Sequence, residues 1–333
     1  MRIAITGASG FVGRAIASRA RLAGCEVLAL ARRDPQLPEV EFRRWDITAP
    51  PSPEVRRIGQ SQDVAAVVHA AAAVDDWVAA ATARRVNIGG TANVLAAFPH
   101  ARFVHISSSS VYPPQGPSVQ IAEDAVRPPL TERIKYFNNY AATKAGAEAV
   151  VRGAVQNKPQ CQAIVLRPHA IYGPGDRTLL PRVEAAVRRG QLWLPAGGAV
   201  AQNLTHVDTI AHAALVAATR NWDAIMGPED EQQEPVVINV ADRAPVIVAD
   251  ALGEVLKRRG IDVQIRALPV AVAHGAAWIL EEAARITGRK SAPVLTRYLV
   301  SQLGYERTYC LKRLRARLGI TPEVTSFRGS ENW

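Results

Sequence analysis

The sequence of 333 residues predicts an α/β fold, in which a doubly wound parallel sheet carries a smaller C-terminal α/β lobe. An apolar run from Ile3 to Thr6 ends at a glycine-rich turn, and the segment from Val12 to Ala23 then repeats apolar residues at helical spacing. A second apolar run, Glu26 to Leu30, follows at βαβ distance. The length allows a second lobe, and an apolar content of 48% excludes a disordered chain.

The glycine-rich turn reads Gly7-Ala8-Ser9-Gly10-Phe11-Val12-Gly13. Gly7 permits the tight turn, Gly10 lets the backbone approach a pyrophosphate, and Gly13 lets the helix pack near the strand. The N-terminus of the helix then faces the anion. Strand, turn and helix together predict a Rossmann-type dinucleotide site; the alternative is a glycine-rich loop with no ligand.

The residues after the second strand bear on the choice of dinucleotide. Sites for NAD place an acid about 20 residues past the glycines for the ribose 2′-hydroxyl, whereas sites for NADP place Arg there for the 2′-phosphate. Here Ala31 occupies the acid position and Arg32 and Arg33 follow, which favours NADP(H) through charge-assisted hydrogen bonds. Two alternatives stay open: the arginines form a solvated loop, or Asp34 turns inward and binds NAD(H).

Tyr140 and Lys144 lie four residues apart on a predicted helix from Asn139 to about Gln156, so they share a face. A neighbouring ammonium favours the phenolate and brings the phenolic proton within working range at neutral pH. The pair predicts proton transfer that accompanies hydride transfer. An ordinary surface Tyr and Lys is the alternative.

A run of serines follows a predicted buried strand, Phe103 to Ile106. Hydroxyls at the carboxyl end of a parallel strand lie where doubly wound sheets bind ligands. One serine from Ser107 to Ser110 is therefore expected to hold a substrate carbonyl oxygen beside Tyr140, unless the run is only a polar loop.

In its ordered motifs the chain resembles the extended short-chain dehydrogenase/reductase family. Besides the glycines and the Tyr-Lys pair, the matching segments are Asp46-Ile47, His69 to Ala72, Asn87 to Asn93, Ile106-Ser107-Ser108, Leu166-Arg167-Pro168, Ile171 to Asp176, His206-Val207-Asp208 and Asn239-Val240. The resemblance implies that Tyr140 is the general acid/base and that Ser108 orients the reacting oxygen. It implies that Lys144 lowers the pKa of the phenol and holds the nicotinamide ribose.

With the two arginines, the resemblance gives an expected cofactor site. Its members are Gly7, Ser9, Gly10, Phe11, Val12, Gly13, Arg32, Arg33, Asp46, Ile47, Ala70, Ala71, Ala72, Asn87, Ile106, Ser107, Tyr140, Lys144, Pro168 and Ile171.

Departures from the family pattern narrow the substrate. Members that act on nucleotide sugars usually grip the diphosphate with Asn and Arg where this chain has Ala170 and Gln202, and a hydrogen bond to a charged group contributes about 1.5 to 3 kcal/mol. Dehydratases carry an acid pair where Ser109 and Ser110 stand. What remains is similar to the 3β-hydroxysteroid dehydrogenase-like and 3-oxoacyl-type ketone reductase branch, which implies a hydrophobic substrate that is sterol-like, 3-oxoacyl or a secondary metabolite. The residues expected to line its pocket are Val74, Trp77, Ser109, Phe137, His169, Tyr172 and Trp193.

The family pattern is interleaved. It assigns residues 1–168 and 203–244 to the dinucleotide-binding domain, through a strand from Val236 to Val240, and residues 169–202 and 245–333 to the substrate lobe. Proline-rich loops are expected at Pro50 to Pro53 and at Pro113 to Pro117, the second overhanging the site. The apolar run from Pro269 to Leu280 falls short of the about 20 residues that span a bilayer, so it predicts a helix of the lobe.

Cysteine usage and charge limit the cellular compartment and the kinds of partner expected for the protein. Cys25, Cys161 and Cys310 are scattered and odd in number, which predicts a reducing cytoplasm without a disulfide framework; no metal-ligand spacing appears. A strand that begins at Arg2 leaves no room for a signal peptide. The net charge of +10 is spread along the chain, its densest cluster from Lys312 to Arg317 lies on a short predicted helix, and no nucleic-acid module accompanies it.

The sequence therefore predicts an NADPH-dependent ketone reductase, or the reverse alcohol dehydrogenase, which acts on a small hydrophobic substrate without a nucleic-acid partner or a transmembrane segment. The family resemblance makes a homodimer plausible, paired through helices that include the one with Tyr140. Two alternatives are a nucleotide-sugar 4-epimerase with bound NAD and a non-catalytic regulator that senses NADP.

Overall fold

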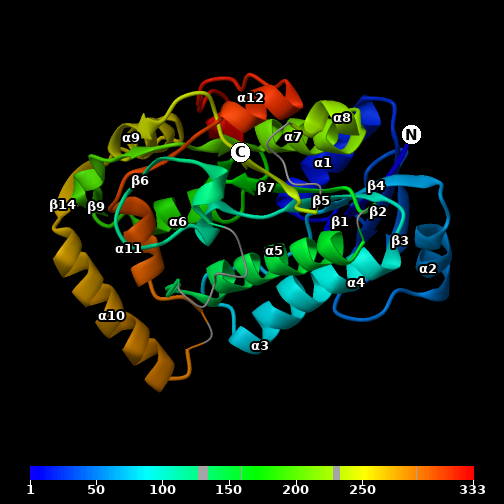
Figure 1. Cartoon of the computed structure of the whole chain (residues 1–333). Coiled ribbons are helices and arrows are strands. Elements are labelled where there is room, and N and C mark those ends of the chain that lie inside the picture. The colour runs from blue at the N-terminus through cyan, green and yellow to red at the C-terminus, as the bar shows by residue number, and fades with distance from the viewer. Residues whose placement is uncertain (127–133, 159, 228–232, 290) are drawn as a thin grey trace.

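The structure is a computed structural model, and it describes residues 1–126, 134–158, 160–227, 233–289 and 291–333. A seven-stranded parallel sheet runs through the centre in the order β12-β7-β5-β4-β1-β2-β3 (Figure 1). These strands are β1 (Arg2–Thr6), β2 (Glu26–Ala31), β3 (Glu41–Arg44), β4 (Val64–His69), β5 (Arg102–Ile106), β7 (Ala163–Pro168) and β12 (Val236–Val240). The predicted doubly wound parallel sheet is confirmed.

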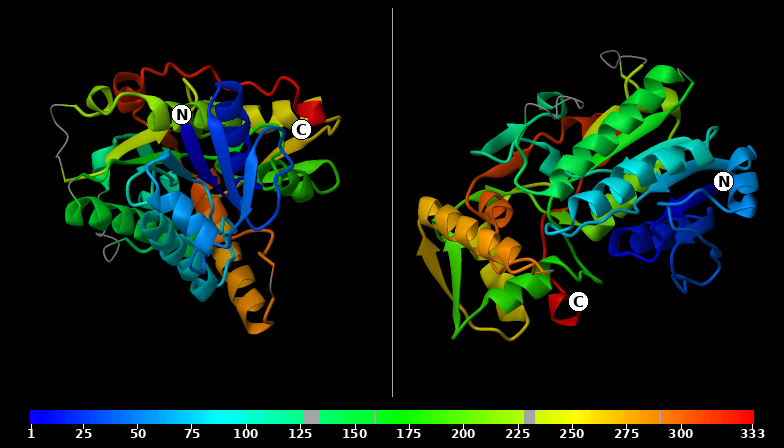
Figure 2. Two further views of the ribbon diagram at one scale, coloured as in Figure 1. Left: turned by 90° about the vertical axis from the view of Figure 1, so that its right-hand side faces the viewer. Right: turned by 90° about the horizontal axis from the view of Figure 1, so that it is seen from below.

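Helices cover both faces of the sheet (Figure 2). One face packs on α1 (Phe11–Leu22), α7 (Val207–Thr219), α8 (Trp222–Ile225) and α12 (Lys312–Leu318). The other packs on α2 (Pro53–Gln60), α4 (Gly90–Ala97) and α5 (Asn139–Asn157), and α3 (Ala80–Ala83) leads through a π-helical turn, Arg84–Gly89, into α4.

Alternation along the strands builds two cores, because successive side chains of a strand point to opposite faces. Ile3 and Ile5 enter the core beneath α1 and α7, whereas Ala4 enters the core beneath α4 and α5. All three are buried, as the strands of a parallel sheet covered on both faces must be.

A smaller lobe lies beyond the carboxyl ends of these strands, and its strands are short. Its helices are α6 (Leu179–Ala186), α9 (Val248–Arg258), α10 (Val270–Ile286) and α11 (Arg297–Leu303). Its strands pair as β8 (Ile171–Tyr172) with β11 (Thr205–His206), as β9 (Gln191–Pro195) with β14 (Gln264–Leu268), and in a four-stranded sheet of β13 (Val246–Ile247), β10 (Ala201–Gln202), β15 (Arg307–Tyr309) and β6 (Ser118–Ile121). Apolar side chains of α6, α9, β9 and β14 form a separate core.

Two segments cross the predicted domain division. Strand β6 belongs by sequence to residues 1–168 but pairs with β15 of the lobe. Helix α12 belongs by sequence to residues 245–333, but its Leu314 and Leu318 enter the core beneath α1 and α7. The division itself stays a prediction.

Helix α10 begins at Val270, directly after Pro269, and continues past Leu280 to Ile286. The helix continues beyond Glu281 and Glu282, which end the apolar run, because Glu281 is buried and forms an ion pair with Arg297. No helix among the described residues combines the length and the apolar character needed to cross a membrane.

Candidate active site

The glycine turn brings α1 against the ends of β1 and β4. Gly7 has a φ of +71°, and a Cβ atom there would lie 2.7 Å from the Cα of Ala71. A Cβ atom at Gly13 would lie 2.2 Å from the carbonyl oxygen of Gly7. Larger residues would displace the turn or the helix, so the packing supports the roles predicted for both glycines.

Buried polar side chains hold the neighbouring strand ends in place. The two nitrogens of His69 contact the hydroxyls of Thr6 (2.7 Å) and Thr91 (3.1 Å). The Asn87 amide accepts from the Ala73 N–H (2.8 Å) and donates to the hydroxyl of Thr143 on α5 (2.9 Å). Asn87, predicted as a cofactor residue, is thus placed to fix the segment after β4.

Tyr140 lies in the first turn of α5, where the Asn138 side chain caps the helix by accepting from the Ala141 N–H (2.9 Å). Ser108, beyond the end of β5, lies beside the Tyr140 phenol and lowers its pKa. One helical turn after Tyr140, the buried Lys144 ammonium donates to the carbonyl oxygen of Ile106 (2.7 Å). The fold thereby gathers the three predicted catalytic residues.

Burial dominates the electrostatics of this trio. It raises the pKa of Tyr140, and the neighbouring Ser108 hydroxyl partly offsets that rise. The lowering of this pKa by Lys144 that the resemblance implies stays a prediction. Burial lowers the pKa of Lys144 itself to about 8, although Glu148 opposes that shift.

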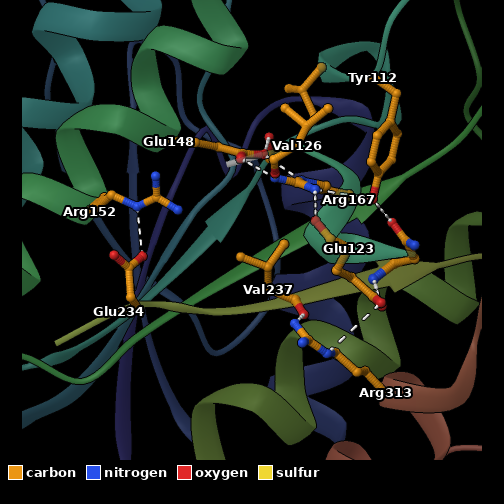
Figure 3. Close-up of polar contacts among 12 residues, drawn as sticks. Tyr112, Glu123, Val126, Glu148, Arg152, Arg167, Glu234, Val237 and Arg313 are labelled. Atoms are coloured by element: carbon orange, nitrogen blue, oxygen red, sulfur yellow. Dashed lines mark hydrogen bonds and ion pairs between the residues drawn. The ribbon is translucent and has the colours of Figure 1, made fainter. Parts of the chain in front are cut away.

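Glu148 continues the face of α5 that carries Tyr140 and Lys144, one further turn along. Its carboxylate accepts from the Ser107 hydroxyl (2.5 Å) and forms an ion pair with Arg167 (2.7 Å), and both charged side chains are buried. Figure 3 shows this pair beside Tyr112, whose hydroxyl accepts from Arg167 (3.0 Å). Glu148 follows Lys144 by four residues, as Lys144 follows Tyr140. This helical spacing could have identified Glu148 from the sequence, although it was not predicted as a site residue.

One cavity of about 1160 Å³ joins the glycine turn, the catalytic residues and the lobe. The predicted residues that line it are Gly7, Ser9, Gly10, Phe11, Val12, Gly13, Arg32, Asp46, Ile47, Ala70, Ala71, Ala72, Val74, Ser107, Ser108, Ser109, Tyr140, Pro168, His169, Ile171, Tyr172 and Trp193. Within the described ranges, the predicted residues outside this wall are Arg33, Trp77, Asn87, Ile106, Phe137 and Lys144, together with the proline-rich loop 113–117.

At the end beside the glycine turn, the cavity wall includes Arg85, which was not predicted from the sequence. A backbone hydrogen bond from Thr48 chiefly lowers the pKa of Asp46, and the charges of Arg32 and Arg85 lower it further. Arg32 follows β2 and Arg85 lies in the π-helical turn before α4, so two guanidinium groups from distant segments flank one end of the cavity. No spacing in the sequence links them.

At the opposite end the wall is mostly apolar. The lobe contributes Leu180, Val183, Leu192, Leu194, Leu204, Val248, Ala251, Leu252, Val255, Leu268, Leu295, Leu299, Leu303 and Phe327. Gln202 is buried, and its amide donates to the carbonyl oxygen of Gln302. This end therefore fits an apolar molecular body, and the first end fits a dinucleotide on the glycine cradle.

Curated relatives cover nearly the whole chain. A ketoreductase of Stigmatella aurantiaca, which acts on 4-hydroxy-2-methyl-3-oxo-4-farnesyl-3,4-dihydroquinoline-1-oxide by its name, is 32% identical over 99% of this chain and 94% of its own. A 2-alkyl-3-oxoalkanoate reductase of Shewanella oneidensis is 28% identical over 98% of this chain and 83% of its own.

Solved structures share the fold at lower identity. UDP-glucuronic acid 4-epimerase from Bacillus cereus, in complex with NAD, is 19% identical with a TM-score of 0.71 over 99% of this chain and 96% of its own. A model of the NAD dependent epimerase/dehydratase family matches residues 3–230. The chain therefore belongs to that family, and it is an NAD(P)-dependent enzyme of the extended short-chain dehydrogenase/reductase type.

Proposed function

We propose that this enzyme interconverts a ketone and a secondary alcohol on a hydrophobic substrate and uses NADP(H). The observation that carries the proposal is the position of Ser108 and Tyr140, in one cavity with a glycine cradle and an apolar wall. The two reductases of Stigmatella aurantiaca and Shewanella oneidensis support the same reaction.

Ser108 and Tyr140 would handle the reacting oxygen. The bound nicotinamide supplies or accepts the hydride. In reduction, the Ser108 hydroxyl orients the carbonyl oxygen and the Tyr140 hydroxyl donates its proton to that oxygen; in oxidation the proton returns to Tyr140. The raised pKa keeps the phenol protonated at neutral pH, which suits reduction. Lys144, with a pKa of about 8, is mostly an ammonium there and stabilises the phenolate left behind.

NADP(H) is proposed over NAD(H) because Ala31 stands where NAD sites place an acid, while Arg32 and Arg85 line the same end. Calorimetric titration with NADPH and NADH tests this on the wild type, Arg32→Ala and Arg85→Ala. We expect tighter binding of NADPH and a loss of about 1.5 to 3 kcal/mol per removed guanidinium, confined to NADPH. Equal affinity for both cofactors in the wild type would reject the preference.

A nucleotide-sugar 4-epimerase is the second candidate, since the structural neighbours include such enzymes. Ala170 and Gln202 line the cavity where such enzymes usually carry Asn and Arg. Tightly bound NAD that survives purification, together with turnover of a UDP-sugar, would favour the epimerase. Oxidation of added NADPH by a long-chain ketone would favour the reductase.

We further propose that the enzyme works in the cytoplasm as a homodimer that pairs through α4 and α5. Static light scattering of the purified protein measures its mass, and a single-chain mass of 35.9 kDa would reject the dimer.

A further inference from the structure

Helix α10 is apolar on the side that faces solvent as well as on the side that packs against the lobe. On the packed side, Ala273 and Ala277 are buried against Val300 of α11. A surface helix of a soluble protein normally carries polar residues on its outer side. The large apolar side chains that α10 exposes instead are Val272, Trp278, Ile279, Leu280 and Ile286.

Exposed apolar side chains are concentrated on this helix. Of the thirteen large apolar side chains that are exposed in the described part of the chain, five belong to α10. Val272, Ile279 and Ile286 recur every seven residues and therefore form one stripe along the helix, and the last two are 61% and 85% exposed. Figures 1 and 2 show α10 at the margin of the molecule, where it projects from the lobe. An exposed apolar surface of this kind marks a binding site.

The wall of the cavity reaches the surface next to the end of α10. Residues 292–295, which follow the helix, line the cavity, and Val294 among them is 67% exposed. Val74, from the loop after β4, also lines the cavity and is exposed. The Trp77 indole N–H donates to the carbonyl oxygen of Arg289 (3.2 Å), which joins this loop to the residues that follow α10. The cavity and the stripe are therefore neighbours.

The unpaired charges at the two ends of the stripe are positive. Arg266 precedes α10 by four residues and Arg289 follows it by three, and both are exposed. Their side chains hydrogen-bond to uncharged side chains and form no ion pair with a carboxylate of the described residues. Of the two acids on α10, Glu281 is buried and Glu282 forms an ion pair with Arg285. An apolar stripe between unpaired arginines is complementary to an anionic lipid surface.

We propose that α10 docks on the surface of an anionic phospholipid bilayer. Its stripe of Val272, Ile279 and Ile286 enters the boundary between headgroups and acyl chains, and Arg266 and Arg289 contact lipid phosphates. The helix has 17 residues, fewer than the about 20 that span a bilayer, so it lies in the plane of the surface. The neighbouring cavity can then take up an apolar substrate from the lipid. Only this uptake rests on the proposed ketone reduction.

Cosedimentation of the full-length protein with vesicles tests the surface. The probes are vesicles of phosphatidylglycerol and phosphatidylcholine in equal parts, and vesicles of phosphatidylcholine alone. We expect the anionic vesicles to bind about 25-fold more tightly, about 5-fold for each of Arg266 and Arg289, and added salt to remove this difference. Equal affinity for the two kinds of vesicle, or binding to neither, would overturn the proposal.

Variants identify the helix as the contact. Ile279→Glu and Ile286→Glu change exposed side chains, so the fold should persist, which circular dichroism checks. Each should weaken binding to the anionic vesicles about 10-fold or more, because it removes buried apolar area and adds a negative charge at the lipid. Leu22→Glu is the matched control, since Leu22 is an equally exposed apolar residue on α1, and its affinity should equal that of the wild type. Unchanged binding in both α10 variants would contradict the proposal.

Two further results separate this proposal from its alternatives. If a second copy of the chain covers the stripe, Ile279→Glu should lower the mass measured by light scattering while the wild type binds no vesicles, and the lipid surface is then wrong. Vesicle binding needs no turnover, so it also separates the surface from the reaction. If no ketone oxidises NADPH but the α10 variants lose vesicle binding, the reaction is wrong and the surface stands. If ketones react and vesicles do not bind, the surface is wrong.

Discussion

At the scale of single residues, Tyr140 is the side chain on which the proposed reaction depends most directly. Tyr140→Phe removes the hydroxyl and keeps the ring in its place at the start of α5. We expect kcat to fall about 100- to 10,000-fold, the usual contribution of a general acid, while NADPH titration still shows binding. Stopped-flow measurement of NADPH oxidation provides the rate, and undiminished turnover would exclude Tyr140 as the proton donor.

Glu148 should tune the charge of Lys144 from one turn away. Its carboxylate raises the pKa of Lys144, so Glu148→Gln should lower that pKa below its value of about 8. Since the ammonium is needed, the alkaline fall of kcat should begin at a lower pH. The variant also leaves Arg167 unpaired, which costs about 3 to 5 kcal/mol of folding stability, so thermal unfolding is measured alongside the pH profile.

Glu234→Gln is the matched control for Glu148→Gln. Glu234 forms an ion pair with Arg152, which lies on the same helix as Glu148, but not with Lys144 (Figure 3). The pH profile of this variant should coincide with that of the wild type. An unshifted alkaline limb in Glu148→Gln would mean that the reaction does not depend on the charge of Lys144.

Local motifs predicted part of the site because they join residues close in sequence. The glycine turn and the Tyr140-Lys144 spacing each lie within a few residues, and the cavity brings Ser108 to Tyr140 as the resemblance implied. Arg85 and Tyr298 could not be predicted in this way, since each reaches the cavity from a separate segment. Arg85 reaches the cavity from the π-helical turn before α4 and Tyr298 reaches it from α11, so only the fold brings them to this wall.

At the scale of elements, long apolar strands were predictable and short strands were not. The strand from Val236 to Val240 has the predicted ends, and the first strand begins at Arg2 and ends at Thr6, as predicted. Strands such as β10 and β13 have two residues each, and only their partners across the lobe define them. Their sequences carry no period of their own.

The contact between α1 and β1 gives a prediction for one glycine. In Gly13→Ala the new methyl group would meet the carbonyl of Gly7, so helix or turn must shift. Overpacking of this kind costs about 1 to 3 kcal/mol of stability, and the displaced turn should weaken NADPH binding. Urea unfolding and NADPH titration measure the two effects.

Gly153→Ala is the control for Gly13→Ala, because Gly153 lies within α5 and its added methyl group meets nothing within 4 Å. Alanine in a helix interior should add up to about 1 kcal/mol of stability relative to glycine. NADPH affinity should not change in this control. Equal effects of the two substitutions would contradict the tight approach of α1 to the turn.

At the scale of the whole molecule, the fold places opposite chemistries at the two ends of one cavity. The sheet domain provides the glycine cradle and two arginines, and the lobe provides an apolar wall. Tyr140 and Ser108 lie on segments of the sheet domain that reach the junction. An enzyme built in this way can change its substrate through the lobe and keep its cofactor.

Three buried histidines make the stability of the whole molecule depend on pH. His69, His105 and His169 are neutral in the folded state, because burial lowers the pKa of His69 and His169 to about 3 and that of His105 well below its ordinary value. An unfolded histidine takes up a proton near pH 6.5. The stabilisation is therefore complete above that pH and is lost as the pH falls toward the folded-state values.

Between pH 7.5 and 5.5 each histidine should cost about 1.4 kcal/mol, so the free energy of unfolding should fall by about 4 kcal/mol in total. Urea unfolding at the two pH values measures this difference. His105 makes no hydrogen bond and stacks beside Phe103, so His105→Phe should fold and should lose about one third of the pH dependence. A variant with the full wild-type pH dependence would show that His105 takes up its proton without unfolding.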